Sequence, residues 1–152
     1  MPKLDHIDKS ILSLLQENAR ISLSEISSTV QLSVSAVSER LRRLEGSGLI
    51  QKYTAILDPH AFHKDVTVLV CLKTRGQDYQ ALYDYVMSTA SITEFYKTAG
   101  VFDFAIKVIT DSATSLDVIL DNIRRMPCVS RVQSSLVLSV GKLAYSITPS
   151  DN

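Results

Sequence analysis

The sequence predicts an α+β protein with a helical N-terminal unit followed by a unit in which strands and helices alternate. Apolar residues recur at helical spacing up to Leu44 and at strand spacing from Val66 onward. The breaker Asp58-Pro59 lies between the two patterns. The chain has 152 residues, enough for one ordinary domain or two small ones. We therefore expect domains at 1–50 and 65–152, joined by a strand and hinge at 51–64.

A first helix is predicted from Leu4 to Glu17. Its inner face carries four apolar residues at helical spacing: Ile7, Ile11, Leu14 and Leu15. Asp5 and Asp8 lie in the first turn, where the helix dipole favours negative charge. This helix would complete a three-helix unit with the two helices that follow it.

Two short helices joined by a tight turn are predicted between Ser22 and Ile50. Ser22 and Glu25 have the spacing of a capping box, and Ser33 is a second good N-cap. The inner stripe of the second helix comprises Val34, Val37, Leu41 and Leu44. The turn, residues 31–33, has the length found in a helix-turn-helix. A strand at 50–57 would follow it as a wing.

The second helix of this pair has the composition of a DNA recognition helix. Small residues near its start allow close approach to base edges, and its arginines can reach phosphates or guanine. The candidate DNA-binding residues are the cap Ser33 together with Ser35, Ala36, Ser38, Glu39, Arg40, Arg42 and Arg43. Of these, Arg40 and Arg43 suit phosphate contacts or structural ion pairs. The same run is also typical of a solvated helix face with local ion pairs.

The sequence of the second unit predicts a sheet of four strands with two helices. The expected strands are 66–72, 92–98, 102–108 and 129–138, and the expected helices have stripes beginning at Tyr79 and at Leu116. Asp111 or Ser112 would cap the second of these helices. The order β-α-β-β-α-β is that of the ferredoxin-like fold. Residues 143–147 are a candidate fifth strand.

Both helices of such a unit cover one face of the sheet and leave the other face open. The positions assigned to the open face mix apolar and polar residues: Leu69, Cys71, Phe95, Ala105, Ile109 and Val137 with Thr67, Lys97 and Gln133. A half-apolar face favours burial against a second copy of the chain. The alternative is a monomer whose surface strands carry a few single apolar residues.

Composition narrows the class of protein. The 16 basic and 16 acidic residues balance, so DNA affinity must come from a local patch and from several copies acting together. Cys71 and Cys128 lack metal-ligand spacing and are typical of thiols in a reducing cytoplasm. His60 and His63 fit a linker better than a metal site. With no signal peptide or membrane-length apolar run evident, we expect a cytoplasmic protein without metal or cofactor.

A glycine turn at 98–103 is a second candidate site. Gly100 permits a turn that exposes backbone N–H groups, and the carboxylate of Asp103 is close in sequence. Such N–H groups could hold the carboxylate of a zwitterion while Asp103 holds its ammonium group. A plain hairpin turn with Asp as a turn former is the alternative.

The layout resembles the Lrp/AsnC family, the feast/famine transcription regulators, over nearly the whole chain. The N-terminal motif is Leu4-Asp5-His6-Ile7-Asp8, Ile11-Leu12, Leu15 and Asn18-Ala19-Arg20. The helix-turn-helix then carries Ser33, Val37, Arg40, Leu44-Glu45, Gly48, Ile50 and Tyr53 in the family's spacing. The family's GxxD turn corresponds to Gly100-Val101-Phe102-Asp103.

This resemblance implies homodimers that assemble to tetramers or octamers and bind an amino acid between dimers. The effector-binding residues that it implies are Gly100, Asp103, Ser134, Ser135 and Leu136. One position departs from the pattern, because many amino-acid-responsive members have a hydroxyl residue where this chain has Ala99. That change puts the effector in doubt: binding could be altered, restricted to another ligand, or absent.

The function expected from the sequence is sequence-specific binding of double-stranded DNA by a transcriptional regulator that is not an enzyme. One alternative is an architectural protein that wraps DNA with little sequence preference. Another is an enzyme resembling the haem-precursor decarboxylases, which share a similar two-domain form and bind a tetrapyrrole. The absence of histidine after His63 argues against that enzyme.

Overall fold

The computed structural model describes residues 4–76 and 78–147, and it divides the chain into two compact units. The first unit consists of Met1–Ile56 together with Lys142–Asn152, and the second consists of Leu57–Gly141. The chain thus passes into the second unit within the segment expected to link the domains, and it returns to the first unit near its end. Each unit is described by itself below.

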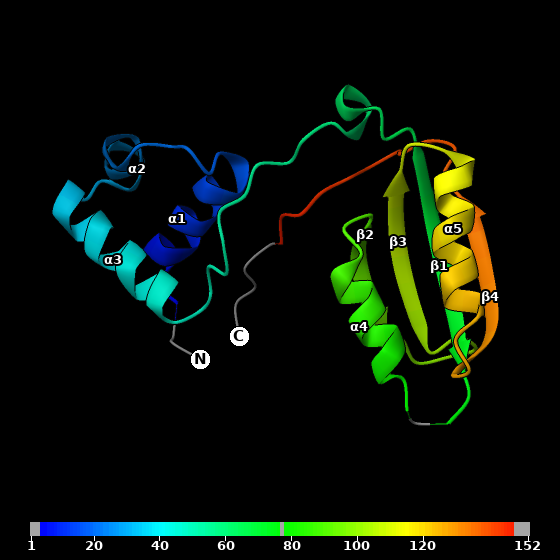
Figure 1. Ribbon diagram of the computed structural model, residues 1–152. Helices are drawn as coiled ribbons and strands as arrows, with labels where there is room; N and C mark the ends of the chain where they lie inside the picture. The colour runs from blue at the N-terminus through cyan, green and yellow to red at the C-terminus, as the bar shows by residue number, and fades with distance from the viewer. Residues whose placement is uncertain (1–3, 77, 148–152) are drawn as a thin grey trace. The chain divides into compact units, whose positions relative to one another are not determined.

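The first unit is a bundle of three helices, α1 (His6–Glu17), α2 (Leu23–Val30) and α3 (Val34–Gly46) (Figure 1). Its core consists of four fully buried residues: Ile11, Ile26, Val37 and Leu44. The predicted caps are confirmed. Ser22 and Glu25 form a capping box, and Ser33 accepts a hydrogen bond from the backbone N–H of Ala36. Gln31 adopts the left-handed conformation in the turn between α2 and α3, which lets the turn stay short.

Helix α1 begins two residues later than predicted, because Asp5 is its N-cap. Asp5 accepts the backbone N–H of Asp8, and the side chain of Asp8 accepts the backbone N–H of Asp5 in return. Two acidic residues therefore form a capping box in which Asp8 takes the place usually held by Glu.

Two predicted strands, at 50–57 and at 143–147, are not formed. Neither segment has a ladder partner among residues 4–76 and 78–147, and an extended segment without one is not a strand. Tyr53, Ile56 and Leu57 remain exposed. Residue Ile147 is instead held by the side chain of Gln16 on α1, whose amide donates to the carbonyl of Ile147 (2.9 Å) and accepts its N–H (2.6 Å).

The second unit follows the predicted β-α-β-β-α-β order. Its elements are β1 (Val66–Thr74), α4 (Gln80–Ser88), β2 (Ile92–Lys97), β3 (Phe104–Thr110), α5 (Ala113–Arg124) and β4 (Val129–Leu136), preceded by the short 3-10 helix Pro59–Phe62. The four strands form one antiparallel sheet in the order β2-β3-β1-β4. This order is that of the ferredoxin-like fold, so the predicted fold class is confirmed.

Helices α4 and α5 cover the same face of this sheet (Figure 1). The core between helices and sheet contains alternate residues of β1 and β3 and one stripe from each helix: Val68, Val70, Leu72, Phe104, Ile106, Val108, Leu82, Val86, Ile119, Leu120 and Ile123. Ser112 caps α5, as one of the two predicted alternatives. Neither α4 nor α5 covers the other sheet face, which carries Leu69 and Cys71.

The prediction that Phe95 and Lys97 lie on the open face is wrong, and a β-bulge explains why. Ile92 pairs with Val108, but Glu94 pairs with Lys107, so one extra residue is inserted in β2. Because side chains alternate with a period of two, one inserted residue moves every later side chain to the opposite face. Phe95 therefore stacks on Phe104 with 5.2 Å between ring centroids, on the helix side.

Candidate nucleic-acid interface and effector turn

The outer surface of α3 begins at a well-capped N-terminus. The Ser33 hydroxyl accepts the N–H of Ala36 at 3.2 Å and lies 3.0 Å from the hydroxyl of Ser35. Further along, Ser35, Glu39 and Arg42 are exposed. Their spacings of four and three residues place them in one stripe along the helix. The structure thus brings three of the predicted DNA-binding residues together on one outward surface.

Ala36 and Ser38 are half-buried beside this stripe, and Val34 is a candidate that the sequence pattern missed. The periodicity places Val34 in the core, but its exposed fraction is 44%. The turn residue Leu32 packs against the core of the unit at this end of α3. An exposed apolar side chain at the start of such a helix can contact the methyl group of thymine.

Arg40 and Arg43 point to α1, where they form ion pairs with two carboxylates. Arg40 Nη1 lies 2.7 Å from Asp5 Oδ2 and 2.7 Å from Asp8 Oδ1. Arg43 Nη2 lies 2.8 Å from Asp8 Oδ1 and 2.7 Å from Asp8 Oδ2. Of the two roles considered for these arginines, the structure has them in structural ion pairs.

The same network shifts the pKa of two of its members, Arg40 and Asp5. Hydrogen bonds to Asp5 and then to Asp8 raise the pKa of the Arg40 guanidinium above its usual range. The backbone N–H of Asp8, followed by Arg40, lowers the pKa of the Asp5 carboxyl. Both shifts favour the charged forms of Arg40 and Asp5, so this pair is ionised at neutral pH.

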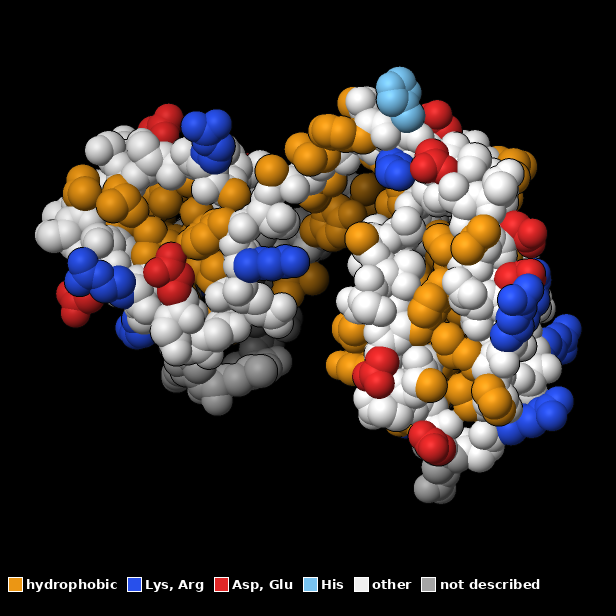
Figure 2. All heavy atoms as spheres, in the orientation of Figure 1, with side chains coloured by type: hydrophobic (Ala, Val, Ile, Leu, Met, Phe, Trp, Pro, Cys, Tyr) orange, Lys and Arg blue, Asp and Glu red, His pale blue; other side chains and the backbone are white. Residues whose placement is uncertain are grey.

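Charges of the two signs are interspersed over the three-helix unit on the face seen in Figure 2. Within α3, Arg42 is exposed and has no acidic partner among the described residues. Glu39 is exposed in the same stripe, and Glu45 accepts a hydrogen bond from Tyr53 at 3.0 Å. The candidate interface is therefore not strongly basic.

The glycine turn joins β2 to β3 and is tied to the end of β1. Gly100 has a φ of +152°, which a residue with a side chain rarely adopts. The N–H of Thr98 is donated to the carbonyl of Asp103 (2.8 Å), and the N–H of Asp103 to the carbonyl of Leu72 (2.9 Å). Hydrogen bonds thus fix the base of the turn, and its tip has a backbone conformation that suits glycine.

The carboxylate of Asp103 already accepts three hydrogen bonds from β1. Its Oδ2 accepts the N–H of Thr74 at 2.7 Å and the Thr74 hydroxyl at 3.0 Å, and its Oδ1 lies 2.9 Å from Lys73 Nζ. These contacts, first the Thr74 N–H and then Lys73, lower the pKa of Asp103 to about 2. The expected ammonium-binding role would therefore compete with partners inside the chain.

The tip of the turn presents backbone N–H groups as hydrogen-bond donors. Among the described residues, no group accepts a hydrogen bond from the backbone N–H of Gly100, Val101 or Phe102. The Arg131 guanidinium lies 5.5 Å from the centre of the Phe102 ring and has no acidic partner in the described part of the chain. In the register of β1 and β4, Arg131 lies directly opposite Lys73, so two cationic residues are cross-strand neighbours. Because Lys73 is paired with Asp103, Arg131 is the cation near the turn that remains without an acidic partner among the described residues, and with the turn N–H groups it favours an anion.

Residues Ser134, Ser135 and Leu136 lie further along the sheet. The register places them opposite Val70, Leu69 and Val68, whereas Asp103 contacts β1 at Thr74. The four residue steps from Thr74 to Val70 span about 13 Å at ~3.3 Å per step. A single chain therefore does not bring Ser134–Leu136 and Asp103 around one small molecule.

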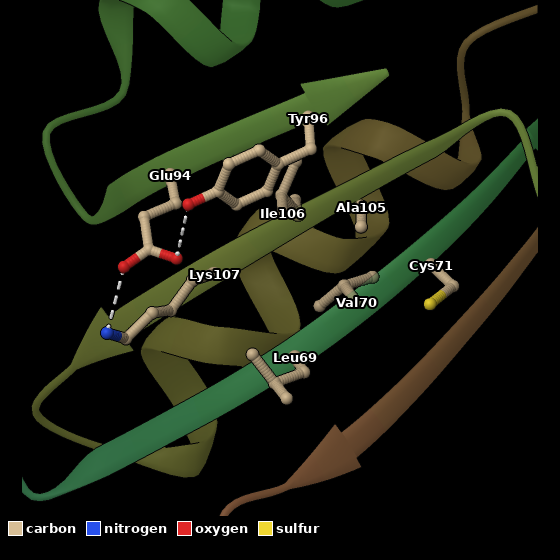
Figure 3. A pocket seen from close by; sticks show the side chains of 8 residues that line it. All are labelled: Leu69, Val70, Cys71, Glu94, Tyr96, Ala105, Ile106 and Lys107. Carbon is tan, nitrogen blue, oxygen red and sulfur yellow. Dashed lines mark hydrogen bonds and ion pairs between the residues drawn. The ribbon is translucent and has the colours of Figure 1, made fainter. Parts of the chain in front are cut away.

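The open sheet face contains a hollow of about 220 Å³ between β1, β2 and β3 (Figure 3). Its lining is Leu69, Val70, Cys71, Glu94, Tyr96, Ala105, Ile106 and Lys107. Glu94 Oε1 lies 3.0 Å from Lys107 Nζ, and the Tyr96 hydroxyl donates to Glu94 Oε2 at 3.1 Å. The exposed apolar surface includes Leu69, at 50%, and Tyr96, at 55%.

Other functional features are few in the described ranges 4–76 and 78–147. They contain no group of three or more His, Cys, Asp or Glu side chains arranged to hold a metal ion. Cys71 and Cys128 are free thiols, both half-buried. No helix within these ranges is long and apolar enough to cross a membrane.

Two protein-family models match the chain. An AsnC-type helix-turn-helix domain matches residues 4–45, and an Lrp/AsnC ligand binding domain matches residues 67–147. The chain is 34% identical over 139 residues to the HTH-type transcriptional regulator FL11 of Pyrococcus horikoshii, covering 91% of this chain and 92% of that protein. It is also 34% identical over 139 residues to the leucine-responsive regulatory protein of Escherichia coli K12, covering 89% and 85% of the two chains.

Solved structures agree with these matches. A transcriptional regulator of Neisseria meningitidis, NMB0573, in complex with L-Met, superposes with a TM-score of 0.90 at 26% identity and covers 95% of this chain and 96% of that one. The leucine response regulatory protein LrpA of Mycobacterium tuberculosis gives a TM-score of 0.82 at 30% identity, with 96% and 100% coverage.

Proposed function

Because the chain belongs to the Lrp/AsnC family of DNA-binding transcriptional regulators, we propose that α3 reads specific DNA sites and that a small carboxylate effector modulates this binding. The family membership confirms the resemblance seen in the sequence. The observation that carries the proposed DNA contact is the exposed stripe of Ser35, Glu39 and Arg42, which starts at a capped helix N-terminus. Helix-turn-helix proteins place this part of the second helix on base edges in the major groove.

The proposed contacts fall into three kinds. Ser35 and Glu39 read polar base edges, and Val34 contacts a thymine methyl group. Arg42 binds phosphate or guanine, since it is exposed and has no acidic partner in the described ranges. Ala36 and Ser38 are small, half-buried residues that keep the backbone close to the DNA.

We propose that a second copy of the chain covers the open sheet face. The support is the half-exposed Leu69 and Tyr96 beside an apolar hollow, on a face that neither α4 nor α5 covers. A symmetric dimer presents two α3 helices to half-sites about one helical turn apart, or a multiple of that. Assembly of dimers into tetramers or octamers would add multivalency, which offsets the balanced charge of the chain.

For the effector we propose that its carboxylate binds the N–H groups of Gly100, Val101 and Phe102 together with Arg131. These donors are without acceptors among the described residues, whereas Asp103 is occupied by Thr74 and Lys73. Ser134, Ser135 and Leu136 would approach from another copy, because one chain does not bring them to this turn. The related Neisseria regulator was crystallised with L-Met, which has such a carboxylate.

We further propose that the chain acts by binding and not by catalysis, and that it does so in the cytoplasm, where its DNA target lies. The support is that its curated relatives are named as transcriptional regulators. Selection of bound fragments from genomic DNA tests the DNA proposal. Enrichment of a two-fold symmetric motif supports it. Equal affinity for selected and random fragments would instead indicate an architectural protein.

The effector proposal is tested by thermal shift with a panel of amino acids, their 2-oxo acids and their amides. Compounds with a free carboxylate are expected to raise the melting temperature, and the amides are not. Arg131→Gln is expected to abolish the shift, whereas Arg125→Gln, an exposed arginine at the end of α5, leaves it unchanged. A flat response to every compound would show a regulator without such an effector.

A further inference from the structure

The arginines of α3 divide into two groups because of one buried carboxylate on α1. The side chain of Asp8 is 1% exposed, and it contacts Arg40 and Arg43, which are 24% and 54% exposed. Arg42 lies between them in sequence but faces solvent. Building on the proposed DNA binding, we infer that Asp8 is a positioning residue: it holds Arg40 and Arg43 on α1 and leaves Arg42 as the arginine of α3 that meets phosphate.

Asp8 is fixed by its backbone as well as by its side chain. Its N–H is donated to Asp5 Oδ1 at 2.7 Å, which is one half of the capping box of α1. Its Oδ1 accepts from both Arg40 and Arg43, and its Oδ2 accepts from Arg43. A phosphate that drew Arg43 away would remove two of these hydrogen bonds from a buried carboxylate, and such a carboxylate is costly to leave without donors.

The pairing also sets the charge that α3 presents to DNA. Arg40 shares Asp5 and Asp8, and Arg43 shares Asp8, so their positive charges are compensated within the unit. Arg42 and Glu39 remain on the exposed stripe. Phosphate attraction, which does not depend on sequence, is therefore weak, and base contacts make up a larger share of the binding. Asp8 thereby acts on sequence specificity without touching DNA.

The first test compares Arg42→Gln and Arg43→Gln by measuring DNA affinity against salt concentration. Each arginine that binds a phosphate contributes about 0.9 to the slope of log affinity against log salt, which is about three- to fourfold in affinity over a fourfold rise in salt. Arg42→Gln is expected to flatten the slope by about that amount. Arg43→Gln is expected to leave it unchanged, since Arg43 is paired with Asp8 and does not meet phosphate.

The second test removes the charge that holds the arginines. Asp8→Asn is expected to steepen the slope by about 0.9 or more, because Arg43 becomes available to phosphate, and to raise affinity for random DNA by at least threefold at low salt. The double variant Asp8→Asn/Arg43→Gln is expected to return the slope to the wild-type value. Asp5→Asn is the matched control: Asn still caps α1 and Arg40 keeps Asp8, so its slope stays unchanged.

Two results would overturn the inference. One is an Arg43→Gln slope as flat as that of Arg42→Gln, which would place Arg43 on phosphate in the wild-type complex. The other is a folded Asp8→Asn protein, judged by circular dichroism, with the wild-type slope. If Asp8→Asn does not fold, the comparison of the two arginine variants still decides. Failure of the wild-type protein to prefer selected fragments would overturn the proposed function instead.

Discussion

Asp8 and Asp103 show how one residue type takes different roles according to which donors reach it. Asp8 is buried between two arginines, and Asp103 is a partly exposed carboxylate fixed by Thr74 and Lys73. The sequence motif singled out Asp103 as a ligand for an ammonium group. In the structure its acceptors are filled by Thr74 and Lys73, and the turn donors lack partners among the described residues, which is why we propose an anion as the ligand.

The hydrogen bonds to Asp103 predict a pH-dependent contribution to stability. Its pKa is about 2 in the folded chain and 3.8 without these partners. A lowered folded pKa means that this contribution is complete above about pH 3.8 and is lost as the pH falls toward about 2. Asp103→Asn is therefore expected to lower the melting temperature at pH 5 to 7 and to differ little from wild type near pH 2. Asp117→Asn, an exposed carboxylate on α5, is the control. A difference independent of pH would contradict the prediction.

The exposed side chain of Val34 predicts that DNA affinity depends on a thymine methyl group. Replacing the thymines of a selected site by deoxyuridine, one at a time, removes single methyl groups. At one position the wild-type protein is expected to lose about fourfold in affinity, which corresponds to ~0.8 kcal/mol for one methyl group. Val34→Ala is expected to bind both forms equally at that position. Leu23→Ala, which removes a similarly exposed apolar side chain from α2, should retain the discrimination.

At the scale of elements, features that depend on nearby residues could be predicted from sequence. The caps Ser22, Ser33 and Ser112 each bond the backbone three residues further on, so a short window contains both partners. The β2 bulge and the pairing of Arg43 with Asp8, 35 residues away, depend on tertiary packing. The spacing of apolar residues in the sequence therefore indicates neither the bulge nor the ion pair. The same limit applies to Val34, which is exposed although its spacing fits the apolar stripe of α3.

The cap of α3 predicts a measurable stability change. Ser33→Ala removes the acceptor for the N–H of Ala36 and is expected to lower the free energy of unfolding by about 0.5–2 kcal/mol in urea. Ser33→Asp and Ser33→Asn preserve the acceptor and should stay close to wild type. A Ser33→Ala protein as stable as Ser33→Asp would show that the hydrogen bond contributes nothing to α3.

At the scale of the whole molecule, the open sheet face predicts the state of assembly. Leu69→Asp places a charge on the surface proposed to face a second copy, and burial of an unpaired charge is unfavourable. Sedimentation equilibrium is expected to show dissociation to monomers and, with it, weaker binding to paired half-sites. Val118→Asp, on the outer surface of α5 with 58% exposure, is the matched control. Unchanged sedimentation of Leu69→Asp would place the interface elsewhere.

The contact between Gln16 and Ile147 has a consequence for how the chain is connected. Because Ile147 returns to α1, the second unit is topologically an insertion into the first, attached by two covalent crossings at 56–57 and 141–142. The segment that returns to α1 follows Gly141 in the chain, so its residues reach the first unit only after the whole of the second unit has been synthesised.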